Sequence, residues 1–161
     1  MADLPRASAS LDDAKAAAAA INDFGFDLHR RLSTKAGNVV FSPASVAIAL
    51  GMARAGARGE TAAQMEAVLR EVASDDHATW LNGLDQLLAG RSGTFEDDEG
   101  TSHELVLDIA NTYFAQRDYP LQETFLEVLA TRFGAGMQLV DFIADSEAAR
   151  GLINAWADEQ T

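Results

Sequence analysis

Cysteine is absent from the 161 residues. Disulfides, thiol nucleophiles, Cys-ligated zinc and iron–sulfur clusters are therefore excluded, and the redox state of the compartment is left open. Histidine is scarce, with three residues, and no two of them have the helical spacing of a zinc site. We expect neither a metal ion nor another cofactor.

Basic residues are also few, because 12 Lys and Arg stand against 25 Asp and Glu and leave a net charge of −13. Most of the imbalance lies in residues 81–161. Nucleic acids and anionic membrane surfaces are bound mainly through Lys and Arg, and no local basic patch is visible in the sequence. We therefore expect no nucleic-acid partner and no membrane partner for this acidic protein.

Long hydrophobic runs are missing as well. The longest uncharged segment, residues 36–53, contains Pro43 and several polar residues, so it does not predict a membrane span. The acidic residues Asp3, Asp12 and Asp13 do not fit a secretory signal peptide. Length and a hydrophobic content of 48% together predict one folded domain.

Hydrophobic residues at three- and four-residue spacing predict a series of helices. Ser42 suits an N-cap and Pro43 the first helical position. The helix that follows is apolar or small all round, so we expect it to be buried on every side. The predicted helices cover residues 11–35, 43–55, a segment ending near Val72, 74–89, a segment around Phe125–Phe133, and a last one from Ser146 with Ala149, Leu152, Ile153 and Trp156 inward.

Branched and aromatic residues predict strands over 38–41, 105–114 and 137–142. Residues 89–103 contain three Gly and the acidic run Glu96–Glu99. That composition cannot bury enough surface to fold by itself, so we interpret the segment as one long loop.

Catalytic and ligand-binding motifs are mostly absent. His29, His77 and His103 are far apart in polar contexts, which favours surface positions, and no Gly-x-Ser-x-Gly elbow occurs. A calcium loop aligned on Gly100 lacks acidic ligands at both ends. The phosphate-loop and dinucleotide spacings at 51–56 and 134–136 lack their remaining residues. The sequence does not predict an enzyme.

Five segments form an ordered series: N-V-V-F-S-P-A-S-V at 38–46, G-A-R-G-E-T-A-A-Q-M at 56–65, A-N-T-Y-F at 110–114, V-D-F at 140–142 and I-N-A-W at 153–156. They resemble the serpin patterns N-x-x-F-S-P-x-S-I, G-A-x-G-x-T-x-x-Q-I, A-N-x-L-F, V-D-F and I-N-x-W-V. The resemblance covers about residues 15–161. The matching positions include Asn38, Asn111, Phe142, Asn154 and Trp156.

The resemblance implies an α+β fold of which residues 1–161 are the helix-rich N-terminal portion of a single serpin domain. The strands at 105–115 and 137–142 would lie toward the edge of the large mixed sheet, and 43–55 would be the helix beneath it. The rest of the sheet and the reactive-centre loop would follow Thr161, so the fold here is incomplete.

Serpins inhibit serine proteases, and in some cases cysteine proteases, by conformational trapping. The resemblance places Ser42 and Ser45 in the polar shutter beneath the sheet, with Pro43 as the fixed start of the buried helix. The sequence is equally compatible with Ser42 acting only as an ordinary helix N-cap. The reactive bond would not lie in this chain, so the chain alone is not expected to inhibit.

The resemblance also implies an extracellular location, with the cytoplasm as the alternative because no signal peptide is visible. Heparin activation is not expected, because the segment 74–89 contains no Lys or Arg. A second hypothesis is a truncated, non-inhibitory chain that binds a partner or oligomerises through an open sheet edge.

Overall fold

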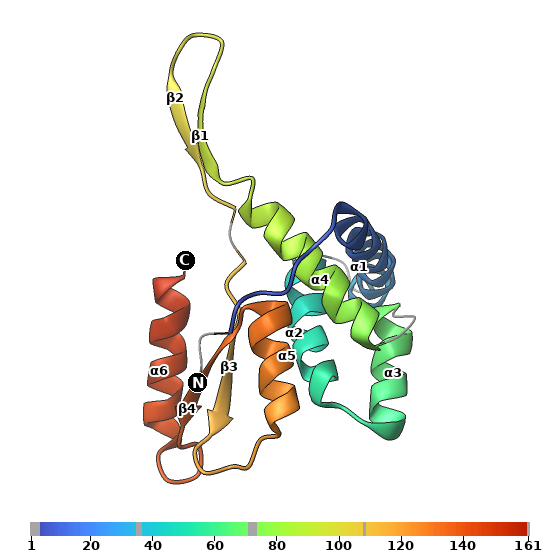
Figure 1. Ribbon diagram of the computed structural model, residues 1–161, viewed down its shortest axis with the longest axis vertical. Coiled ribbons are helices and arrows are strands. Elements are labelled where there is room, and N and C mark those ends of the chain that lie inside the picture. The colour runs from blue at the N-terminus through green and yellow to red at the C-terminus, as the bar shows by residue number, and fades with distance from the viewer. Residues whose placement is uncertain (1–3, 35–36, 71–73, 108, 161) are drawn as a thin grey trace.

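The computed structural model describes residues 4–34, 37–70, 74–107 and 109–160, with the side chains of 74–76 outside that description. Within these ranges, six helices and two separate two-stranded sheets follow one another (Figure 1). In chain order they are α1 (Leu11–Leu32), α2 (Pro43–Gly56), α3 (Gly59–Leu69), α4 (Ser74–Ala89), β1 (Gly93–Glu96), β2 (Ser102–Leu105), β3 (Thr112–Gln116), α5 (Glu123–Phe133), β4 (Gly136–Val140) and α6 (Ser146–Glu159).

Helices α1 and α4 pack at very short range. The hydroxyl of Ser10 accepts the N–H of Asp13, whose carboxylate accepts the N–H of Ser10, so a capping box starts α1. The inward positions that follow are small alanines. On α4, a Cβ at Gly83 would stand 2.8 Å from Asp13 Cβ and 3.0 Å from the backbone nitrogen of Ala14. Small residues on both helices therefore set their separation.

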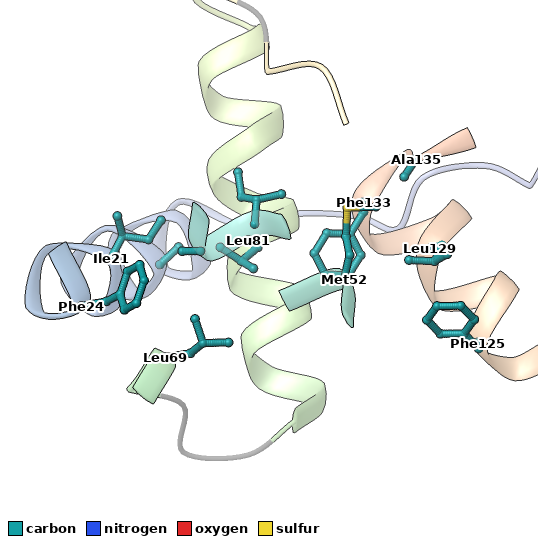
Figure 2. Close-up of a cluster of buried hydrophobic side chains, with 12 residues drawn as sticks. Ile21, Phe24, Met52, Leu69, Leu81, Phe125, Leu129, Phe133 and Ala135 are labelled. Atoms are coloured by element: carbon teal, nitrogen blue, oxygen red, sulfur yellow. The ribbon is translucent and has the colours of Figure 1, made fainter. Parts of the chain in front are cut away.

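One hydrophobic core joins the first five helices (Figure 2). Met52 of α2 lies near its centre, between side chains of α1 and α4 on one side and the aromatic rings of α5 on the other. Burying such side chains stabilises the fold by about 1.5–3 kcal/mol each. The cluster comprises Ala17, Ile21, Phe24, Ala47, Ile48, Met52, Leu69, Leu81, Phe125, Leu129, Phe133 and Ala135.

Strands β3 and β4 form a parallel pair, with Thr112 opposite Gly136 and Gln116 opposite Val140. Successive side chains of a strand point to opposite faces. The ring of Tyr113 contacts Phe125 of α5 edge-on, with 5.6 Å between centroids, and the next residue, Phe114, contacts Trp156 of α6 at 6.0 Å. Helices α5 and α6 therefore cover opposite faces of this sheet.

The prediction of one long loop over 89–103 is wrong, because β1 and β2 form an antiparallel hairpin that projects from the end of α4 (Figure 1). Local contacts replace a buried core. The Asp97 carboxylate accepts the backbone N–H of Thr101 at 2.8 Å and of Glu99 at 3.0 Å, and the rings of Phe95 and His103 stack. All eight strand residues are exposed.

The other strand predictions were too broad. Residues 38–41 form no strand, because no strand in the described ranges lies beside them, and Val40 is 95% exposed. Of the segment 105–114, only 112–114 belong to β3, Leu105 belongs to β2, and Asp108 is outside the described residues. The last predicted strand ends at Val140 instead of 142.

The helix predictions hold for position and need correction for burial. Helix α1 ends at Leu32, and Lys35 and Val72 lie outside the described residues. Helix α2 is buried on one side only, whereas its other side carries exposed residues at helical spacing. On α6, Leu152 is exposed although it was expected to point inward. In the described ranges, no helix is both long and apolar enough to cross a membrane.

Candidate functional site

The start of α2 is fixed by three residues that the sequence singled out. The Ser42 hydroxyl accepts the backbone N–H of Ser45 at 3.2 Å, so Ser42 is the N-cap, and it also accepts the Ser45 hydroxyl at 2.9 Å. Pro43 occupies the first turn of the helix. Its ring lies so close to α1 that a Cβ at Gly25 would stand 2.9 Å from it. The two hydroxyls are therefore held in fixed positions where α2 crosses α1.

A hollow of about 280 Å³ beside this helix start brings together three of the predicted residues. Ser45 lines it from α2, Asn111 from the segment just before β3, and Trp156 from α6. A neighbouring hollow of about 300 Å³ shares Asn111 and Trp156. Motif positions more than 100 residues apart in sequence thus meet at one place in the fold.

From this hollow an exposed stripe continues along α2. Ala49 lies four residues after Ser45 and three after Val46, Ala53 follows four residues later, and all four are exposed. The side chains are small and, apart from one serine, apolar. A helix face of this composition is normally covered in a folded protein.

The remaining motif positions lie elsewhere. Asn38 is exposed in the segment between α1 and α2, and Asn154 is exposed on α6. Phe142 follows β4 and is 41% exposed, with its backbone N–H donating to Gln116 Oε1 at 2.8 Å. The structure gives these three residues no common site.

Asp141, the middle residue of the V-D-F motif, organises the chain after β4. Its Oδ1 atom accepts the backbone N–H of Ala144 at 2.9 Å and the side-chain amide of Gln116 at 3.1 Å. These hydrogen bonds favour the ionised form and hold the pKa of this carboxyl below its usual value. The sequence signal that could have found it is an aspartate directly after a predicted strand. An Asp side chain in such a position accepts the backbone N–H groups of the residues that follow in the turn.

His77 corrects the expectation that all three histidines lie on the surface, because it is only 2% exposed. Burial in the protein interior, and secondly the nearby positive charge of Arg54, lower its pKa from 6.5 to about 4. Its ring contacts Trp80 edge-on. The i, i+4 spacing from His77 to the buried Leu81 was the sequence signal for an inward position.

The comparison with protein families agrees with this geometry, since the model for Serpin (serine protease inhibitor) matches residues 19–161. The chain belongs to the serpin family. The motif series and the α+β architecture, helix-rich with few strands, are thereby confirmed as those of a partial serpin fold.

Several serpins resemble the chain over most of its length. An uncharacterized serpin-like protein of Thermococcus kodakarensis is 38% identical over 142 residues, which are 88% of this chain and 32% of that protein. The leukocyte elastase inhibitor of Xenopus tropicalis is 32% identical over 145 residues, covering 88% and 36% respectively.

Solved serpin structures match the fold. A cleaved Serpin 42Da aligns with a TM-score of 0.69 at 30% identity, over 88% of this chain and 35% of that one. Reaction-loop-cleaved lamprey angiotensinogen aligns with a TM-score of 0.71 at 28% identity, over 92% and 41%. The chain therefore spans roughly a third to two fifths of the length of the serpins that it matches.

Proposed function

We propose that this chain is the N-terminal part of a serpin-type inhibitor of serine proteases, with cysteine proteases as the alternative target class. The observation that carries the proposal is the exposed stripe of α2 beside the hollow lined by Ser45 and Asn111. Asn111 immediately precedes β3, which pairs only with β4 in the described ranges. Further strands added beside β3 would extend the sheet and cover the stripe.

Under this proposal the complete protein inhibits by conformational trapping. The protease nucleophile attacks a peptide carbonyl of the reactive-centre loop, the peptide bond breaks, the new amino terminus leaves, and an acyl-enzyme ester remains. The cut loop then inserts into the large sheet as an extra strand and distorts the attached protease. The role proposed for Ser42 and Ser45 is to hold and release the strands above α2 as the sheet opens.

The chain by itself supplies neither the reactive loop nor the strands between which that loop inserts. We therefore expect residues 1–161 alone not to inhibit a protease.

We also propose that the protein is not an enzyme. The Ser42 and Ser45 hydroxyls hydrogen-bond to each other, and the Ser42 hydroxyl also accepts a backbone N–H of the helix. This is the arrangement of a helix cap and not of a nucleophile with its base.

The coding sequence beyond Thr161 provides the first test. The proposal predicts that a further segment follows, about as long as the part of the relatives that this chain does not match. That segment should contain further strands and a small-residue hinge before a reactive loop. A stop codon directly after Thr161, with no serpin-like sequence in the neighbouring reading frames, would contradict the inhibitory function.

A second candidate function follows from the same open edge. An unpaired strand edge can capture a strand from another chain, and the outer edges of β3 and β4 carry no strand in the described ranges. The chain would then act as a binding or oligomerising module. Size-exclusion chromatography of the chain tests this function. Oligomers that dissociate when a residue at the β3 edge is replaced by Pro would support it. A well-dispersed monomer would contradict it.

The location of the protein is proposed from the family, with export first and the cytoplasm second. Heparin is not proposed as a cofactor, because α4 carries no Lys or Arg. Fractionation of the source cells, followed by detection of the protein in the medium or in the cell extract, distinguishes the two locations.

A further inference from the structure

A cavity of about 560 Å³ lies where the end of α2 meets the start of α3, the start of α4 and one side of α5. Three arginines line it: Arg54 from α2, Arg58 from the turn before α3, and Arg132 from α5. His77 of α4 also lines it, but its pKa of about 4 leaves the ring uncharged near neutral pH. No Asp or Glu is among the lining residues in the described part of the chain. In a protein of net charge −13 this concentration of positive charge is unexpected.

Two of the three arginines have donors available. The Nη1 atom of Arg58 donates to the carbonyl oxygens of Ala55 at 3.1 Å and Ala57 at 2.7 Å, which fixes the guanidinium. An arginine has five N–H donors, so others remain. Arg132 is half-buried, and among the described residues its side chain has no hydrogen-bond or ion-pair partner. Buried Arg54 pairs with Glu66, so its charge is compensated within the protein.

The starts of two helices contribute backbone donors, although each first turn also carries an acidic residue, Glu60 in α3 and Glu123 in α5. Neither Arg58, the N-cap residue of α3, nor Gln122, the N-cap residue of α5, gives its helix a side-chain cap. Gly59 and Thr124, in the first turns of these helices, both line the cavity. Uncapped first turns present free N–H groups and the positive end of the helix dipole.

We propose that this cavity binds a small molecule with two or more anionic groups, either a polycarboxylate or a phosphorylated compound. The volume lies in the range of ligand pockets, about 300–1,000 Å³. Guanidinium groups bind carboxylate and phosphate oxygens in a bidentate manner, so Arg58 and Arg132 would each hold one anionic group. The site is distinct from the hollow beside Ser45 and does not depend on protease inhibition.

The test titrates the purified chain with citrate and with inorganic pyrophosphate at constant ionic strength, and with acetate as the monovalent control. Calorimetry measures binding. Tryptophan fluorescence of a Trp156→Phe variant reports on Trp80, whose ring centroid lies 6.3 Å from that of His77. Saturable binding with a dissociation constant of about 1 mM or tighter for either multivalent probe supports the site, and the preferred probe distinguishes carboxylate from phosphate. Failure of both to bind, or equal binding of acetate, overturns the proposal.

Charge variants locate the site. Arg58→Gln and Arg132→Gln should each weaken binding about tenfold or more, because each removes a charge-assisted hydrogen-bonding group. Arg150→Gln removes the same charge from exposed α6, where Arg150 pairs with Glu147, and should leave binding unchanged. Circular dichroism verifies that the variants are folded. Equal losses in all three variants, or none in the first two, would show non-specific attraction and would overturn the proposal.

Discussion

At the scale of single residues, Gly83 marks the closest approach between two helices. A Cβ added there would stand 3.0 Å from the backbone nitrogen of Ala14 and 3.2 Å from the carbonyl oxygen of Ser10, and backbone atoms cannot rotate away. Gly83→Ala should therefore lower the free energy of unfolding by about 1–3 kcal/mol, measured by urea denaturation.

Gly151 provides the matched control for this substitution. It is also a helical glycine, in α6, but a Cβ there would meet no atom within 4 Å. Gly151→Ala should stabilise the protein by about 0.5–1 kcal/mol, because alanine favours the helix more than glycine does. If both variants stabilised the protein, helix propensity would outweigh the contact between α1 and α4.

Ser42 allows the N-cap to be separated from the hydroxyl pair. Ser42→Ala removes the acceptor for both the Ser45 backbone N–H and the Ser45 hydroxyl, and should cost about 1 kcal/mol of stability. Ser45→Ala keeps the cap and should cost clearly less, because it removes only one exposed hydrogen bond. Thermal or urea unfolding of the two variants checks the order, and a larger cost for Ser45→Ala would contradict the capping geometry.

His77 predicts a specific pH dependence. The unfolded chain takes up a proton on this ring near pH 6.5, whereas in the fold the pKa is about 4. Between these values the unfolded state binds more protons, so the free energy of unfolding falls as the pH is lowered through this window. Urea denaturation at about pH 7, 6 and 5 should show the fall, before most carboxylates begin to titrate.

His77→Gln is the control for that pH series. It removes the titrating ring and should flatten the fall between about pH 6.5 and 5, whatever its effect on absolute stability. An unchanged slope in the variant would assign the pH dependence to other groups and would contradict the buried, neutral state of His77.

At the scale of elements, the N-terminal segment and the β1–β2 hairpin differ in how they are attached. Arg6 donates to Asn82 Oδ1 at 2.7 Å and pairs with Asp85 at 2.9 Å, while Asn82, which is fully buried, donates to the carbonyl oxygen of Ala7. The guanidinium of Arg6 also lies over Gly134, whose φ of 57° ends α5. The segment thus holds α4 and α5 together.

Removal of residues 4–9 should consequently lower the free energy of unfolding by about 2 kcal/mol or more, since it removes the Arg6 and Ala7 partners of buried Asn82 and leaves only the side-chain amide of Gln86 among the described residues. Replacement of residues 93–105 by a short Gly-Ser linker should change it by about 1 kcal/mol or less, because the hairpin is exposed and loop closure depends weakly on length. Urea denaturation of both deletions measures this, and a larger loss from the hairpin would reverse the assignment.

The sequence predicted elements best where local signals were strong. The Ser42-Pro43 start of α2 is a local feature, and the sequence predicted it. The hairpin was missed because a few turn contacts, such as those of Asp97, are enough to form it without a core. The strand at 38–41 was predicted from residue types alone, although a strand forms only beside a partner, which no local sequence window reveals.

At the scale of the whole molecule, the motif order was sufficient to identify the family, but it did not reveal how the site is assembled. Ser45, Asn111 and Trp156 were named from separate motifs, and only the fold brings them to one hollow. The cationic cavity was missed altogether, because its arginines come from different elements and the overall charge suggested the opposite. Composition describes the average surface and not a local one.

The exposed face of α2 is also a property of the whole molecule. The sequence predicted full burial from small residues on every side, whereas the described chain covers one side only. The difference is consistent with the proposal that further strands beside β3 complete the sheet. Hydrogen exchange of α2 can be compared between the complete protein and residues 1–161. Slower exchange at Val46 and Ala49 in the complete protein would indicate their burial and support the proposal.

The central claim is most directly tested by covalent complex formation. The complete protein that contains this chain, and residues 1–161 alone, would each be incubated with trypsin-like, elastase-like and subtilisin-like proteases and then analysed by denaturing gel electrophoresis. The account predicts an SDS-stable complex with at least one protease for the complete protein and none for residues 1–161. A stable complex with residues 1–161 alone, or no complex with any protease for the complete protein, would contradict it.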